Sequence, residues 1–131
     1  MYFCTMLKNR YLILLGVFCL MAFVSCSKHT QILKSTDNEL KYNAAMAYYE
    51  QKDYNRALQL FDVLQAAYRG KPQAEEIAYF TAECYYGLGD YNIASHYYKR
   101  YAVNFPFGKN VETAIFRSAY CYYKESPSME L

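Results

Sequence analysis

The sequence predicts an all-α fold, an α-solenoid of stacked helix hairpins with about two and a half repeats after an N-terminal signal helix. Ala45, Ala82 and Ala119 stand 37 residues apart, and a Tyr-Tyr pair follows each of them at the same distance. An Asp-Tyr-Asn triplet follows the first two pairs in register, and glycines or prolines separate the periodic segments. A fixed period of this length is typical of repeat architectures, in which each unit buries its apolar face against its neighbours.

The first 25 residues have the pattern of an export signal. Lys8 and Arg10 precede residues 11–24, a run without charge that is too short for a bilayer span and suits a signal peptide. Residues 23–26, Phe-Val-Ser-Cys, resemble a bacterial lipobox. This resemblance implies cleavage before Cys26, a diacylglyceryl group on its thiol and a palmitate-type chain on its new amine. The alternatives are an uncleaved membrane anchor and an ordinary secretory signal.

A polar stretch follows Cys26, as expected of a tether between a lipid and a folded domain. The residue after Cys26 is Ser27, not the aspartate that is associated with retention in the inner membrane. Lipoproteins exported to the cell surface resemble one another in having acidic residues soon after the cysteine, whereas the first acidic residue here is Asp37. Both features favour lipid anchoring in the outer membrane, facing the periplasm. The predicted organisation is a signal peptide at 1–25, a tether at 26–36, a repeat array at 37–125 (units 37–71, 72–108 and a partial 109–125) and a truncated continuation at 126–131.

Each repeat unit is predicted to contain two helices. Thr36 and Glu39 form a plausible capping box for a helix over 37–51, and Asp53 can cap a second helix over 54–69. Gly70 and Pro72 then break the chain.

The second unit repeats this plan. Pro72 opens a helix to about residue 86 that Gly87 and Gly89 end, and Asp90 caps a helix that stops by residue 104. Asn110 can cap a last helix that ends near residue 125.

The repeated residues resemble the tetratricopeptide (TPR) pattern. That resemblance implies close helix crossings at Ala45, Ala82 and Ala119. It also implies a small residue early in each second helix with an aromatic ring one turn later, which Ala57–Phe61 and Ala94–Tyr98 supply. Tyr48, Tyr85 and Tyr122 occupy the TPR tyrosine position, and we expect them in the core. The sequence departs from the pattern in its 37-residue period and in lacking an aromatic residue near each repeat start, at Lys41, Ala78 and Ile115.

By TPR register, the first helices line a concave groove with three rows of side chains, spaced one helical turn apart. These rings suit an extended peptide with apolar or aromatic side chains. The alternative is that many of them pack between repeats as core. The predicted groove residues are Tyr42, Tyr79 and Phe116, then Met46, Glu83 and Tyr120, then Tyr49, Tyr86 and Tyr123.

Composition excludes several other classes of function. With 54% hydrophobic and 20% charged residues, the chain is not a disordered tail. Without the two signal cations it carries 12 basic and 12 acidic side chains, so the basic stripe of a nucleic-acid-binding protein is missing. We find no catalytic, metal-binding or cofactor-binding motif and expect neither an enzyme nor a small-molecule substrate. Cys84 and Cys121 are predicted to be buried free thiols.

A signal, a lipobox and immediate TPRs of long period resemble the BamD family of outer-membrane assembly lipoproteins, of which this chain would be an N-terminal fragment. The resemblance implies a scaffold whose partners are the β-barrel assembly subunit and unfolded outer-membrane proteins, with attachment to the membrane through the lipid. One alternative is another envelope TPR lipoprotein that coordinates division or cell-wall synthesis. A second is a glycan-binding lipoprotein similar to SusD, although its inserted loops fit poorly with the short links at 51–53 and 87–90.

Overall fold

The computed structural model describes residues 28–126, which are helical with short connections and contain no strand. The chain divides into two compact units, residues 1–35 and 36–131. In the first unit, residues 28–34, which lie within the predicted tether, are helical. The predicted signal peptide, the lipidation site Cys26 and most of the predicted continuation at 126–131 lie outside the described residues.

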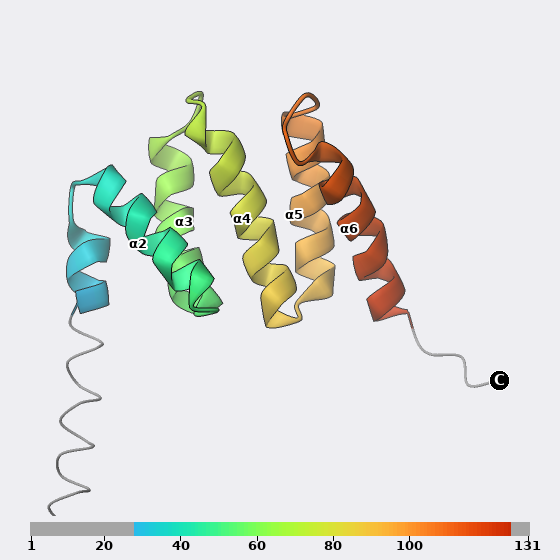
Figure 1. The fold of residues 1–131 in the computed structure, drawn as a ribbon, viewed down its shortest axis with the longest axis horizontal. Helices are drawn as coiled ribbons and strands as arrows, with labels where there is room; N and C mark the ends of the chain where they lie inside the picture. Colours follow the sequence, from blue (N-terminus) through green and yellow to red (C-terminus); the bar gives the residue numbers. More distant parts are fainter. Residues whose placement is uncertain (1–27, 127–131) are drawn as a thin grey trace, which may run out of the picture. The chain divides into compact units, whose positions relative to one another are not determined.

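Five helices make up the described part of the second unit, and each packs against the next in chain order. Figure 1 shows them running in alternating directions, as stacked hairpins require. The predicted all-α fold is confirmed. The helices are α2 (Asn38–Glu50), α3 (Tyr54–Ala67), α4 (Gln73–Leu88), α5 (Tyr91–Asn104) and α6 (Val111–Glu125).

The first helix begins one residue later than the capping box predicts. Asp37, not Thr36, is the N-cap of α2, and its carboxylate accepts hydrogen bonds from the backbone N–H of Glu39 at 2.9 Å and of Leu40 at 3.0 Å. Aspartate satisfies two of the free N–H groups of the first turn while placing negative charge at the positive end of the helix dipole. Asp37 is therefore the N-cap in place of the neighbouring Thr36, because threonine is the weaker capping residue.

The predicted N-caps of α3, α5 and α6 differ in their hydrogen bonds. Asp53 caps α3 by accepting from the backbone N–H of Arg56 at 3.3 Å, as predicted. Asp90 and Asn110 occupy the N-cap positions of α5 and α6, but their side chains make no capping hydrogen bond.

The end of α4 corrects a second prediction. Gly89 is the C-cap, in the left-handed conformation with φ 83°, whereas Gly87 lies inside the helix. A Cβ atom on Gly87 would overlap the Tyr54 ring. Gly87 therefore allows the start of α3 to approach the end of α4. In the sequence alone, a glycine with this packing role cannot be distinguished from a glycine that ends a helix.

The core repeats with the sequence. Ala45 and Ala82 are fully buried on α2 and α4, and the alanine–aromatic pairs of α3 and α5 are buried too: Ala57, Phe61, Ala94 and Tyr98. The third member of the alanine row, Ala119, is exposed. No described helix covers that side of α6, which explains why this alanine is accessible.

The TPR tyrosine position is less buried than predicted. Tyr48 and Tyr85 are half-buried, and Tyr122 is 52% exposed. Arg56 lies over the Tyr48 ring at 5.7 Å, and the Tyr85 ring packs against Tyr97 with 4.8 Å between centroids. The prediction that these rings form core was wrong for Tyr122, which only α5 borders, with the Lys99 ammonium 2.8 Å from its hydroxyl.

Candidate functional site

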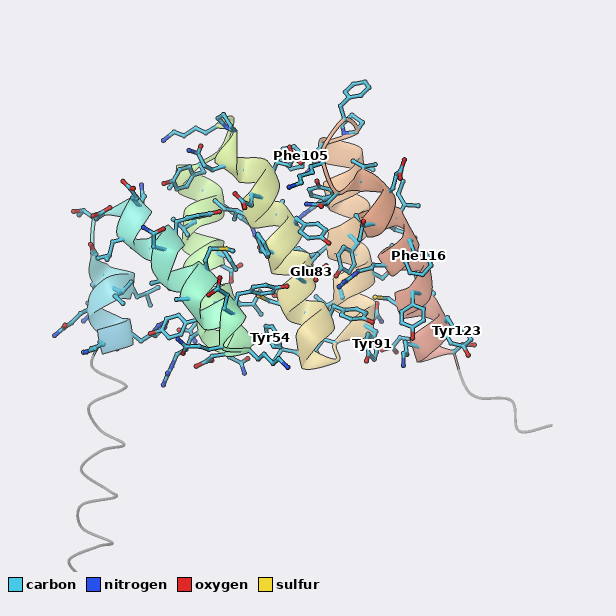
Figure 2. All side chains as sticks on the ribbon, in the orientation of Figure 1. Tyr54, Glu83, Tyr91, Phe105, Phe116 and Tyr123 are labelled. Atoms are coloured by element: carbon cyan, nitrogen blue, oxygen red, sulfur yellow. The ribbon has the colours of Figure 1, made fainter. Side chains whose placement is uncertain are left out.

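The helices form two layers, and the nine predicted groove residues all come from one of them. Helices α3 and α5 each pack between two of the helices α2, α4 and α6. Side chains of α2 and α6 also reach Glu83 of α4, so the first helices of successive units lie on the same side. We call the side of α2, α4 and α6 that carries these nine residues the inner face. Figure 2 shows Glu83 midway along α4, with Phe116 and Tyr123 on α6 at the end of the array.

Exposure differs across the inner face. Phe116 and Tyr123 are 67% and 73% exposed, whereas Glu83 is buried, with 7% of its surface exposed. The other six are half-buried: Tyr42, Met46, Tyr49, Tyr79, Tyr86 and Tyr120. Most of these side chains therefore pack against neighbours and also present one edge to solvent, as amphipathic aromatic residues commonly do.

Glu83 joins all three repeat units. Its carboxylate accepts hydrogen bonds from the Tyr98 hydroxyl at 2.7 Å, from the Arg117 guanidinium at 2.7 Å and, more weakly, from the Tyr49 hydroxyl at 3.4 Å. These partners come from α5, α6 and α2, respectively. Because a buried carboxylate is stable only when paired and hydrogen-bonded, this network fixes how successive hairpins stand relative to one another.

Arg117 is a residue of the inner face that the sequence prediction missed. It pairs with Glu83, also donates to the Tyr98 hydroxyl at 3.3 Å, and lies over the Tyr86 ring at 5.0 Å. Its side chain remains 32% exposed, so part of the guanidinium borders the surface. The only sequence signal was a single acidic residue, Glu83, within otherwise uncharged rows. The repeat period does not predict which basic residue pairs with Glu83.

The network keeps the tyrosine hydroxyls protonated. Burial and the charge of Glu83 raise the pKa of Tyr49 to about 12. Burial also raises the pKa of Tyr79 and Tyr98, and the nearby Glu83 carboxylate adds to both shifts. Near neutral pH these groups are therefore hydroxyls that donate hydrogen bonds, and the inner face presents neutral, amphipathic rings.

The exposed end of the inner face lies on α6. The Phe116 and Tyr120 rings stack with centroids 6.1 Å apart, and Tyr120 contacts Tyr123 at 5.9 Å. The Lys124 ammonium lies 5.5 Å from the Tyr120 ring. Three rings in succession along one helix form an apolar strip rimmed by a cation, a pattern found at protein-binding surfaces.

The predicted rows are only partly brought together. Tyr49 contacts Glu83 of the next unit, and Tyr86 contacts Arg117 of the unit after that. No direct ring contact joins Tyr49, Tyr86 and Tyr123, all of which are described. Burial, together with the nearby Glu76 carboxylate, raises the pKa of Tyr42. The inner face is thus a series of rings linked through polar groups, not a continuous aromatic stack.

Other features of the described part concern thiols, metals and membranes. Cys84 and Cys121 are buried and free, as predicted. Residues 28–126 hold no group of three or more histidine, cysteine or carboxylate side chains placed to bind a metal ion. Within the same range, no helix has the length and apolar character needed to cross a bilayer.

Comparison with protein families gives a match that covers most of the chain. The model of a family described as "YfiO: Outer membrane lipoprotein" matches residues 34–130, which include all five helices of the repeat array. A search of curated proteins finds no match.

Proposed function

The chain belongs to the YfiO family of outer membrane lipoproteins, and from this premise we propose that it is a BamD-type scaffold of the β-barrel assembly machinery. In this proposal it works by binding and not by catalysis. Its partners are the β-barrel assembly subunit and unfolded outer-membrane proteins. The inner face holds an unfolded substrate segment in extended form.

The observation that carries the proposal is the inner face itself. Six half-buried and two exposed side chains there are apolar or aromatic, and the raised pKa values of Tyr49 and Tyr79 keep those two hydroxyls protonated. Aromatic side chains offer large contact area with few rotatable bonds, and protonated hydroxyls can donate to peptide carbonyls. An extended chain exposes such carbonyls together with alternating side chains. A β-strand segment of an outer-membrane protein, rich in apolar and aromatic residues, matches this surface chemically.

Attachment to the membrane is the second part of the proposal. We propose that Cys26 carries the lipid and that the repeat array faces the periplasm from the outer membrane. One acyl chain gives marginal attachment, whereas a diacylglyceryl group with an amide-linked chain is a stable anchor. Intact mass measurement of the membrane-extracted protein tests this assignment. Cys26→Ser should abolish the added lipid mass and leave residues 1–25 uncleaved.

The proposed function is tested by peptide binding. The probe is a fluorescein-labelled 12-residue peptide with alternating apolar residues and a C-terminal phenylalanine, measured by fluorescence anisotropy with the full chain in neutral detergent. Tyr49→Ala/Tyr86→Ala should weaken binding about tenfold or more, because each ring removed is an aromatic anchor. The matched control is Tyr48→Ala/Tyr85→Ala, which removes the same atoms one position earlier, facing α3 and α5.

A second pair of variants guards against loss of folding. Phe116→Ser and Tyr123→Ser change exposed side chains, so together they should leave the unfolding transition nearly unchanged and still reduce peptide affinity. Unaltered affinity in both inner-face pairs, with intact folds, would show that the groove is not the binding site. A pull-down from envelope extract identifies the partner, and a β-barrel subunit with periplasmic domains is the expected one.

A further inference from the structure

A second surface lies on the other side of the array. A hollow of about 850 Å³ lies between α3 and α5, against the N-terminal half of α4. Its walls come from two second helices, and its floor includes Ala74 and Ala78 of α4. These alanines lie on a different side of α4 from Tyr79 and Glu83, because successive helical residues point in different directions. The hollow is therefore separate from the inner face.

Cations dominate the lining of this hollow. Arg69 and Lys71 come from the connection between α3 and α4, Arg100 comes from α5, and Asp62 is the one acidic lining residue. All four are exposed. The formal charge of the lining is therefore +2, in a chain that is balanced outside its signal.

Two of the three cations lie over tyrosine rings. Lys71 lies over the Tyr68 ring at 5.0 Å, and Arg100 lies over the Tyr97 ring at 4.4 Å. Within the described range, neither arginine of the hollow forms an ion pair within 4.0 Å. Rings hold a cation in place but leave its hydrogen-bond donors available.

We propose that this hollow docks an acidic segment of a partner protein. Arginine guanidinium groups bind carboxylates through paired N–H donors, and an alanine floor lets a peptide backbone approach closely. Burial raises the pKa of Asp62, and the positive charge of Arg100 offsets part of that shift.

The test measures binding of a defined acidic peptide to the full chain in neutral detergent. The probe is a fluorescein-labelled, amidated peptide of three Glu-Ala-Ala-Leu repeats, compared with its Gln-Ala-Ala-Leu counterpart. The wild-type chain should bind the glutamate peptide more tightly, and added salt should weaken that binding. Arg69→Gln/Arg100→Gln should weaken it about tenfold or more.

The matched control removes the same charge elsewhere. Lys99→Gln/Lys109→Gln changes two cations that do not line the hollow, and it should retain wild-type affinity. Equal affinity of both double variants for the glutamate peptide overturns the proposal. The proposal is also overturned if the glutamate peptide does not bind and the chain instead floats with phosphatidylglycerol vesicles in a way that depends on Arg69 and Arg100. Binding of the aromatic peptide to the inner face should be unchanged in the Arg69→Gln/Arg100→Gln variant, which separates this site from the proposed groove.

Discussion

At the scale of single residues, Glu83 connects more of the molecule than any other side chain of the inner face. Its carboxylate holds Tyr98 of its own unit, Arg117 of the next unit and Tyr49 of the previous one. Desolvating a carboxylate costs several kcal/mol per ion, and the cost is offset here by one guanidinium and two hydroxyls. The pair therefore contributes specificity of stacking more than net stability.

Replacing Glu83 with glutamine should destabilise the chain by about 2 kcal/mol, because Arg117 loses its counter-charge while still partly buried. The cost stays below that of a fully buried pair, since the Arg117 side chain is 32% exposed. Urea unfolding followed by circular dichroism measures the difference. The control is Arg56→Gln, which breaks the Arg56–Asp53 pair; both of its side chains are 34% exposed, whereas Glu83 is buried, so the change should cost less than about 1 kcal/mol. Equal losses in both variants would contradict the role assigned to Glu83.

The buried thiols give a prediction about pH. Burial raises the pKa of Cys84 from 9.0 to about 12, and burial also raises that of Cys121. At pH 8.5 the folded chain should therefore resist iodoacetamide at both cysteines, whereas the urea-unfolded chain should react. Peptide mass spectrometry reads the two positions separately. Rapid alkylation of Cys84 in the folded chain would contradict its burial.

The same shift has a defined sign for stability. Below pH 9 the Cys84 thiol is protonated in the folded and unfolded chains alike, so the folded state bears no penalty. As pH rises from about 9 to 12, the unfolded chain ionises first and stability falls. Cys84→Ala should reduce that fall.

At the scale of helices, tertiary packing decides details that local rules leave open. Gly87 and Gly89 are equivalent as helix-ending signals in the sequence, but only Gly89 has a positive φ. Gly87 stays helical because the Tyr54 ring occupies the space that a side chain would take.

Gly87→Ala sets two effects against each other. Alanine favours a helix by about 1 kcal/mol over glycine, whereas overpacking against the Tyr54 ring costs about 1–3 kcal/mol. We expect net destabilisation in the wild-type background. In a Tyr54→Ala background the clash is absent, and Gly87→Ala should instead stabilise by about 1 kcal/mol. Thermal unfolding of the four variants measures this cycle, and the same sign in both backgrounds would contradict the packing role of Gly87.

Much of this architecture is predictable from the sequence, because the repeat imposes it. The alanines at 45, 57, 82 and 94 are buried where the 37-residue period places them, and each helix lies within a few residues of its predicted range. The pairing of Glu83 with Arg117 is not predictable in this way. It joins residues 34 positions apart that occupy different positions in the repeat, so neither periodicity nor helical spacing relates them.

At the scale of the whole repeat array, stacking gives the molecule two chemically different sides. The first helices present neutral rings around a satisfied ionic network, whereas the second helices border a hollow with excess positive charge. Each side requires at least two stacked units, because Glu83 takes its partners from three units and the hollow takes its walls from α3 and α5. We therefore expect variants that disturb stacking to weaken both surfaces together.

The central claim is that an extended peptide lies along the inner face, and photo-crosslinking tests it most directly. Benzoyl-phenylalanine is placed at Phe116 or Tyr123, both exposed on α6, and as a control at His96, exposed on α5. With the labelled apolar peptide that ends in phenylalanine, crosslinks should form at the two α6 positions and not at His96. Crosslinking that is strongest at His96, or absent from α6 while the peptide remains bound, would contradict the account.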